Sequence, residues 1–255
     1  MEQNTLTVSG DDKVAVLTLS RPHCLDIAGK HALLDAVNSL TERPNLRALI
    51  IAASHSQAWL VNVAELVEMH PAEARAFSHA GHKLAQAIAS LPVPVIAAVD
   101  AAALGGGCEL VLACDITLAG AAARFGQIEA MGGVLPAFGG TWRLARRVGH
   151  QRAIEMLFTA EVVDAQTAKA IGLAIDVVAS ADLMNRAQAL ASQITKSSRQ
   201  SVAAIKRVVE AGTNLPPSAI SALEEETFAG LFGTDEQRGR MRAFLASQTA
   251  KPTAS

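Results

Sequence analysis

The sequence predicts an α/β core followed by a helical C-terminal region. Up to residue 178, short apolar runs typical of buried strands alternate with segments whose apolar residues recur at helical spacing. Beyond residue 178, the apolar pattern has only the helical period. A chain of 255 residues can bury one large core, or one core with a helical appendage. We therefore expect a core domain at residues 1–195 and a helical region at residues 196–255.

The N-terminal segments predict a β-hairpin, a helix and a further strand. Residues 5–8 and 14–19 alternate between apolar and polar side chains, as paired strands do. Residues 30–40 place their leucines and Val37 on one helical stripe. The apolar run at residues 46–52 is typical of a buried strand.

The next segments predict further helix and one more buried strand. A loop through His55 and Trp59 leads to helical patterns between residues 63 and 91. Two prolines, Pro92 and Pro94, end the helical pattern, and the apolar residues 94–99 then predict a strand. The alternation of strand and helix therefore continues through this half of the chain.

A triple glycine at residues 105–107 opens a short apolar helix that contains Glu109. Backbone N–H groups at a helix start have no partner within the helix, and glycine lets a ligand approach them closely. Such a turn can stabilise an oxyanion that develops during a reaction. A second glutamate, Glu129, follows twenty residues later.

The C-terminal part of the chain predicts three or more helices with apolar stripes. The stripes are formed by Leu183, Ala187, Leu190 and Ile194, by Val202, Ile205 and Val209, and, after Pro216 and Pro217, by Ile220, Leu223 and Leu231.

Composition and charge exclude several classes of function. The formal net charge is −2 and the 22 basic residues are scattered, so no nucleic-acid partner is expected. Apolar runs are broken well before the roughly 20 residues that span a bilayer, so no membrane partner is expected. No signal peptide is recognised, and three cysteines without paired spacing fit a reducing compartment. We expect a soluble, cytoplasmic protein.

Motifs of several common chemistries are missing from the sequence. Leu110 stands where a dinucleotide-binding motif needs its third glycine, and the run Gly139-Gly140-Thr141 lacks the lysine of a phosphate-binding loop. No HExxH, CxxC or G-x-S-x-G pattern occurs, so neither zinc hydrolysis nor serine acyl transfer has a local signature.

The remaining reactive side chains favour structural roles. Cys108 and Cys114 are expected to be small buried apolar residues. His79 and His82 share one predicted helix but have no third ligand in sight, so no metal site is expected.

Arg143, Arg146 and Arg147 form the densest basic group of the sequence. A charge run usually marks a solvated face, so these arginines are expected on the exposed side of a helix rather than at an anionic ligand.

The middle of the chain resembles the enoyl-CoA hydratase/isomerase, or crotonase, superfamily. The motifs ALGGGCEL, ACDI, ARFGQ-x-E and GGT-x-RL occur in the order and spacing of that family. The resemblance runs from the SRP that begins at Ser20 to the DEQRGRMRAF that ends at Phe244. It implies a spiral of ββα units with a helical C-terminal region that completes a homotrimer, often paired into a homohexamer.

The resemblance also implies an active site. Gly106 matches the family position whose N–H forms half of an oxyanion hole, and Gly105 precedes it in the substrate-binding turn. Glu109 and Glu129 match the two glutamates with which hydratases hold and activate water. A glutamate near a helix start can instead simply complement the helix dipole, and a triple glycine can be a packing device. With both glutamates in the family register, we favour the catalytic interpretation.

Two segments depart from the family pattern. Where the family has a loop of the type F-S-A-G-A-D-L, this chain has residues 58–66, without the glycine and about two residues shorter. Val61 is the best match for the second oxyanion donor, with Asn62 as the next candidate. Asn62 and Trp59 are also expected beside the substrate. Ala137 replaces a customary glycine near the reacting end of the substrate.

A third departure is at the C-terminal end, where the Lys/Arg pair that commonly follows Phe244 is missing. Recognition of coenzyme A is therefore expected to differ from that of the family.

The function predicted from this resemblance is hydration of the α,β double bond of an acyl-CoA thioester. No cofactor is expected, since coenzyme A is part of the substrate. One alternative is another reaction of the superfamily, by an isomerase, hydrolase or decarboxylase acting on an unusual acyl group. A second alternative is a non-catalytic scaffold or RNA-binding relative. Retention of both glutamates favours the hydratase.

Overall fold

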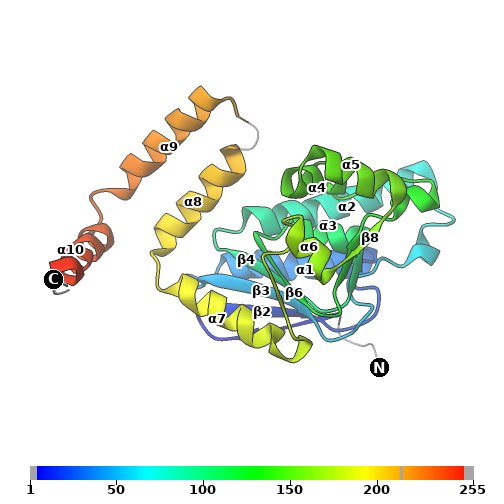
Figure 1. Cartoon of the computed structure of the whole chain (residues 1–255), viewed down its shortest axis with the longest axis horizontal. Helices are drawn as coiled ribbons and strands as arrows, with labels where there is room; N and C mark the ends of the chain where they lie inside the picture. Colours follow the sequence, from blue (N-terminus) through cyan, green and yellow to red (C-terminus); the bar gives the residue numbers. More distant parts are fainter. Residues whose placement is uncertain (1–4, 213–214, 250–255) are drawn as a thin grey trace. The chain divides into compact units, whose positions relative to one another are not determined.

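The computed structural model describes residues 5–212 and 215–249. The chain divides into two compact units, Met1–Thr195 and Lys196–Ser255, and each unit is described by itself. The first unit contains all of the strands that the structure describes, and the second contains the last three helices (Figure 1).

A six-stranded sheet forms the centre of the first unit. The predicted hairpin is confirmed, because the first two strands pair antiparallel, and the four strands that follow are all added in parallel. In spatial order the strands are β1 (Leu6–Gly10), β2 (Val14–Leu19), β3 (Ala48–Ala53), β4 (Val95–Val99), β6 (Ile116–Gly120) and β9 (Asp176–Val178).

Each face of this sheet has its own apolar cluster. In β3, Leu49 and Ile51 belong to one cluster while Ile50 belongs to the other, as the two-residue period of a strand requires. The first cluster lies under α1 (Ile27–Thr41) and α2 (Pro71–Ser90). The second is covered by α7 (Leu183–Thr195), which lies on the opposite side of the strands from α2 in Figure 1.

A smaller sheet of three strands lies next to the candidate site, because its first strand ends just before the triple glycine. Its strands are β5 (Ala102–Leu104), β7 (Arg124–Gly126) and β8 (Val162–Asp164). The remaining elements of this unit are η1 (Val63–Glu65), α3 (Gly106–Leu112), η2 (Glu129–Gly132), α4 (Gly140–Val148), α5 (His150–Thr159), α6 (Ala165–Ala170) and η3 (Ser180–Asp182). Because β5 ends at Leu104, it delivers the triple glycine directly to the start of α3.

Asp26 caps the N-terminus of helix α1. The Asp26 carboxylate accepts from the Gly29 N–H at 2.6 Å, and Arg21 holds that carboxylate in an ion pair at 2.7 Å. This cap fixes where the helix starts, and with it the buried side of the helix, which includes Lys30, Leu33 and Val37.

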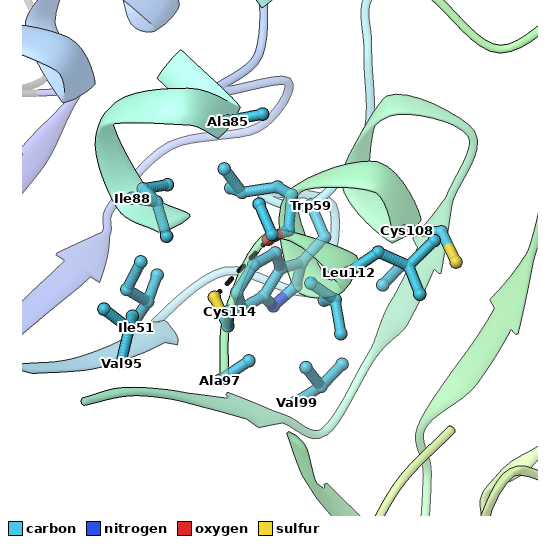
Figure 2. Packing of buried hydrophobic residues seen from close by; sticks show 14 of the residues in the cluster. Ile51, Trp59, Ala85, Ile88, Val95, Ala97, Val99, Cys108, Leu112 and Cys114 are labelled. Carbon is cyan, nitrogen blue, oxygen red and sulfur yellow. Dashed lines mark hydrogen bonds between the residues drawn. The ribbon is translucent and has the colours of Figure 1, made fainter. Parts of the chain in front are cut away.

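Trp59, Cys108 and Cys114 pack in the larger cluster, as Figure 2 shows. The Trp59 side chain is fully buried there, and so are Cys108 and Cys114, as the sequence predicts for the cysteines. The Cys114 thiol donates to the Leu110 carbonyl at 3.4 Å. All three cysteines of the chain are free.

The arginine group differs from the expectation. Arg146 is exposed, but Arg143 is only 8 % exposed, and Arg147 donates to the Cys114 carbonyl at 2.7 Å. Because α4 packs on α3, two of its arginines extend along protein rather than into solvent. The prediction of a wholly exposed basic face is therefore wrong.

The second unit is helical, as predicted. It consists of α8 (Arg199–Gly212), α9 (Pro217–Leu231) and α10 (Asp235–Thr249). Neither α8 nor α9 has a buried residue, although their predicted apolar stripes are present. Across both units, none of the helices in the described ranges is long and apolar enough to cross a membrane.

Candidate active site

The turn before α3 has a backbone that favours glycine. Gly105 caps the helix with φ +55° and ψ −125°, and its N–H donates to the Gly126 carbonyl at 2.9 Å. A Cβ on Gly107 would stand 1.6 Å from the Trp59 carbonyl oxygen, so the loop of residues 58–66 reaches this helix only because Gly107 has no side chain. The triple glycine therefore shapes the site and joins the loop to it.

Glu109 is buried and held by three backbone donors. The Phe138 and Gly140 N–H groups donate to Oε1, both at 2.6 Å, and the Ala137 N–H donates to Oε2 at 3.2 Å. Its side chain is 1 % exposed. A carboxylate has about four acceptor positions, so three N–H bonds leave one position on Oε2 for a water.

Opposing effects act on the pKa of Glu109. Burial raises this pKa above its usual value. The N–H donors of Gly140, Phe138 and Ala137 oppose the rise, and so does the charge of Lys30. The three donors bind best to the ionised carboxylate, because their hydrogens all point at its oxygens.

Glu129 begins η2 and lies against the glycine turn. A Cβ on Gly105 would stand 2.9 Å from Glu129 Oε1, which places this carboxyl beside the start of α3. With its amide nitrogen turned toward the carboxyl, buried Gln127 donates to both Glu129 oxygens at 3.1 Å. Burial, followed by the charge of Glu109, raises the pKa of Glu129 to about 7.

The two glutamates are thus coupled, and they have different partners. Glu109 has three fixed backbone donors, whereas Glu129 has one side-chain amide. Two acidic groups that interact share their protons as a pair, and the pair here keeps a proton more readily than an isolated glutamate. The arrangement offers one carboxylate and one carboxylic acid near neutral pH.

The Val61 side chain lies against Gly106, and these are the two residues expected to provide oxyanion donors. Val61 Cγ2 lies 2.7 Å from the position of a Cβ on Gly106. Gly106 is the first residue of α3, so its N–H has no partner inside the helix. In the part of the chain that the structure describes, neither N–H donates to another group.

Of the other residues predicted to contact the substrate, Ala137 lies beside Glu109, whereas Trp59 lies in the core. Half-buried Ala137 adjoins Glu109, because its N–H donates to that carboxylate. The Asn62 side chain caps η1 by accepting from the Ala64 N–H at 3.3 Å. The buried Trp59 side chain has no exposed surface to offer a substrate, so we now assign it to the core.

Sequence reasoning missed Gln127 and the donors of Phe138 and Gly140. Gln127 stands directly after β7 and two residues before Glu129, so a polar residue at this position was a usable signal. Backbone donors have no such signal, because every residue except proline has an N–H. Within the described ranges, no three His, Cys, Asp or Glu side chains are grouped as metal ligands.

Comparison with known proteins places this arrangement in a family. The family model described as enoyl-CoA hydratase/isomerase matches residues 9–251. The chain belongs to the enoyl-CoA hydratase/isomerase family. Its crotonase fold carries the glycine turn and both glutamates.

Named members of this family resemble the whole chain. It is 35 % identical over 250 residues to a short-chain-enoyl-CoA hydratase of Clostridium acetobutylicum, covering 96 % of each chain. It is 34 % identical to a crotonyl-CoA hydratase of Syntrophomonas wolfei, covering 98 % of each. The crystal structure of an enoyl-CoA hydratase from Mycobacterium smegmatis superimposes with a TM-score of 0.89 at 30 % identity, covering 96 % of this chain and 97 % of that one.

Proposed function

We propose that the protein adds water across the α,β double bond of an enoyl-CoA thioester, as a hydro-lyase. The observation that carries this proposal is the pair formed by Glu109 and Glu129 at the start of α3. Hydration needs one group to take a proton from water and another to deliver a proton to the α-carbon. The pair supplies both from adjoining positions.

Their surroundings support a division of roles between the glutamates. Glu109, with three N–H donors, is the ionised group and accepts the proton of a water bound at the open position of Oε2. Glu129, with its pKa raised to about 7, carries the proton that passes to the α-carbon. After the addition, the proton taken up by Glu109 passes to Glu129, which restores the starting protonation of the pair. The cycle therefore uses no cofactor beyond the substrate.

The thioester oxygen gains negative charge during this addition. We propose that the Gly106 and Val61 N–H groups stabilise it, since the Val61 side chain lies against Gly106 and neither N–H has a partner among the described residues. One such donor contributes about 3–4 kcal/mol to the transition state. Ala137, beside Glu109, lines the reacting end of the acyl group.

A panel of enoyl-CoA thioesters tests this function. We expect the ultraviolet absorbance of the conjugated thioester to disappear and the product to gain one water, with short or medium acyl chains preferred. Double-bond migration or thioester cleavage without hydration would assign the site to an isomerase or a hydrolase of the same family. No turnover of any thioester would leave a non-catalytic scaffold.

We also propose that the chain assembles as a homotrimer or a dimer of trimers. Large apolar side chains of the second unit are exposed on the single chain; Val209 is 65 %, Phe228 62 % and Phe244 62 % exposed. Exposed apolar area of this kind favours association. Light scattering of the full chain tests the assembly, and a monomer at micromolar concentration would contradict it.

A cytoplasmic location is the last part of the proposal. It is supported by the three cysteines, which are all free and buried. Fractionation of the cells that naturally produce the protein would test it.

A further inference from the structure

Lys30 is a buried charge that the reaction above does not use. It lies in the first turns of α1 on the same side as Leu33 and Val37, and its side chain is 1 % exposed. Burying an ammonium is costly unless other groups replace its water. Among the described residues Lys30 forms no ion pair within bonding distance, so its site must stabilise the charge in another way.

Two aromatic rings and one carbonyl surround the ammonium. Lys30 Nζ lies 2.9 Å from the centroid of the Phe77 ring and 4.6 Å from that of Phe138, and it donates to the Phe77 carbonyl at 3.3 Å. A cation over an aromatic face is attracted by the negative face of the ring, most strongly where water is excluded. Lys30 thereby joins α1 to α2 and to the loop before α4.

Phe138 connects this cation to the candidate site. Its N–H donates to Glu109 Oε1 at 2.6 Å, while its ring packs 5.4 Å from the Phe77 ring between centroids. The same ring fills the space above two glycines: a Cβ on Gly81 would stand 1.8 Å from it, and a Cβ on Gly106 2.5 Å. The position of the Phe138 backbone is therefore set by the cation, α2 and α3 together.

The charges of Lys30 and Glu109 also favour each other. Burial lowers the pKa of Lys30 to about 7, and three carboxyl groups oppose that fall: Glu65 of η1, Asp26 at the start of α1 and Glu109 of α3. In return, the charge of Lys30 lowers the pKa of Glu109. α2 contributes the Phe77 carbonyl to this environment.

We propose that Lys30 is a positioning residue for Glu109: its ammonium holds Phe138, and with it the backbone donors of the carboxylate, and favours the ionised form of Glu109. This inference rests on the proposed hydratase function, in which Glu109 accepts a proton from water. Lys30 does not touch the substrate in this account. It acts through Phe138 and through its charge.

The test replaces Lys30 with methionine, which keeps the length of the side chain and removes the charge. The matched control is Lys83→Met, the same change at an exposed position of α2. The pH dependence of kcat/KM is measured with crotonyl-CoA for the wild type and both variants. For Lys30→Met we expect the acidic limb, which reports ionisation of Glu109, to move upward by about one pH unit. The rate at acidic pH then falls about tenfold. Lys83→Met leaves the limb in place.

An unmoved acidic limb in a folded Lys30→Met protein would overturn the proposal, because loss of the charge and displacement of the Phe138 N–H would both raise the pKa of Glu109. If Lys30→Met does not fold, Lys30→Gln is measured in the same way with the same expected shift. The wild type separates the two claims, since an inactive wild type refutes the hydratase function and not the role of Lys30.

In that case an infrared titration of the buried carboxyls decides, with the Glu109 band assigned by Glu109→Gln. The Glu109 band must titrate at higher pH in Lys30→Met than in the wild type, and equal titration would overturn the inference.

Discussion

The Phe138 N–H donates to Glu109 Oε1 at 2.6 Å, and this bond joins the loop before α4 to the helix that carries the first glutamate. The same carboxylate accepts from two further N–H groups, that of Ala137 in this loop and that of Gly140 at the start of α4. Because the donors belong to the backbone, the carboxylate is held by the path of the chain. The catalytic geometry therefore depends on packing that fixes this path, at Gly106, Gly81 and the Lys30 ammonium.

Gly107→Ala is expected to destabilise the fold. The added Cβ would stand 1.6 Å from the Trp59 carbonyl oxygen, and backbone atoms cannot move aside as a flexible side chain can. We expect a loss of about 1–3 kcal/mol in the free energy of unfolding, the usual effect of overpacking. Chemical denaturation measures it. The control is Gly132→Ala, whose Cβ meets nothing within 4 Å. Equal stability of the two variants would show that the loop does not approach α3 this closely.

Val61→Pro is expected to remove one oxyanion donor, because proline has no N–H. We expect kcat to fall by roughly 10²–10³. Val61→Ala keeps the N–H and is expected to retain kcat within a few-fold, with any change mainly in KM. Circular dichroism checks that both variants fold. A folded Val61→Pro enzyme with the kcat of Val61→Ala would place the donor elsewhere, with Asn62 as the next candidate.

The pH dependence of hydration is expected to show the ionisation of Glu129. Burial and the neighbouring Glu109 raise the pKa of Glu129 to about 7, so the proton needed at the α-carbon is present below that pH and lost above it. We therefore expect kcat/KM for hydration to fall above about pH 7, measured from about pH 5 to pH 9. A rate that stays constant through this range would contradict the assignment of Glu129 as the acid.

Lys30 is expected to make stability depend on alkaline pH. In the unfolded chain its pKa has the ordinary value of 10.5, and in the fold it is about 7, so the unfolded state binds more protons between these values. The free energy of unfolding must then rise with pH across this window, by up to about 1.4 kcal/mol per pH unit. The cost of burying the charge is fully present below pH 7. Lys30→Met should remove this part of the slope, while Lys83→Met should keep it; identical slopes in both variants would refute the lowered pKa.

Much of the fold could be predicted because its long elements have clear periods. Apolar spacing predicts the hairpin of β1 and β2 and a helix at residues 30–40, and the structure has that helix at residues 27–41. The smaller sheet could not be found, since β5, β7 and β8 have three residues each and a two-residue period needs more. Arg143 was misplaced because a run of charges says nothing about the helix that packs beside it.

In the site, the sequence predicts the functional side chains but not the backbone donors. Glu109, Glu129 and the glycine turn can be predicted, because their residue types carry the chemistry and the motif fixes their spacing. The three N–H donors of Glu109 come from the loop before α4 and the first residue of α4, about thirty residues later, and only the folded path of the chain brings them to Glu109. Lys30 stands on the stripe of Leu33 and Val37, so a charge at a buried helical position was a signal that could have been used.

The most direct test of the central claim is the rate of crotonyl-CoA hydration by the wild type and by Glu109→Gln and Glu129→Gln. The control is Glu42→Gln, the same change at the exposed end of α1. In Glu109→Gln the NH₂ of the new amide must face at least one of the three backbone N–H donors, and two donors facing each other can destabilise the fold. The thermal unfolding of this variant is therefore measured together with its rate. We predict that each active-site variant stays folded and loses roughly 10²–10⁴ of kcat, while Glu42→Gln keeps wild-type activity. Full activity in folded Glu109→Gln and Glu129→Gln would contradict the account, because hydration would then proceed without the pair.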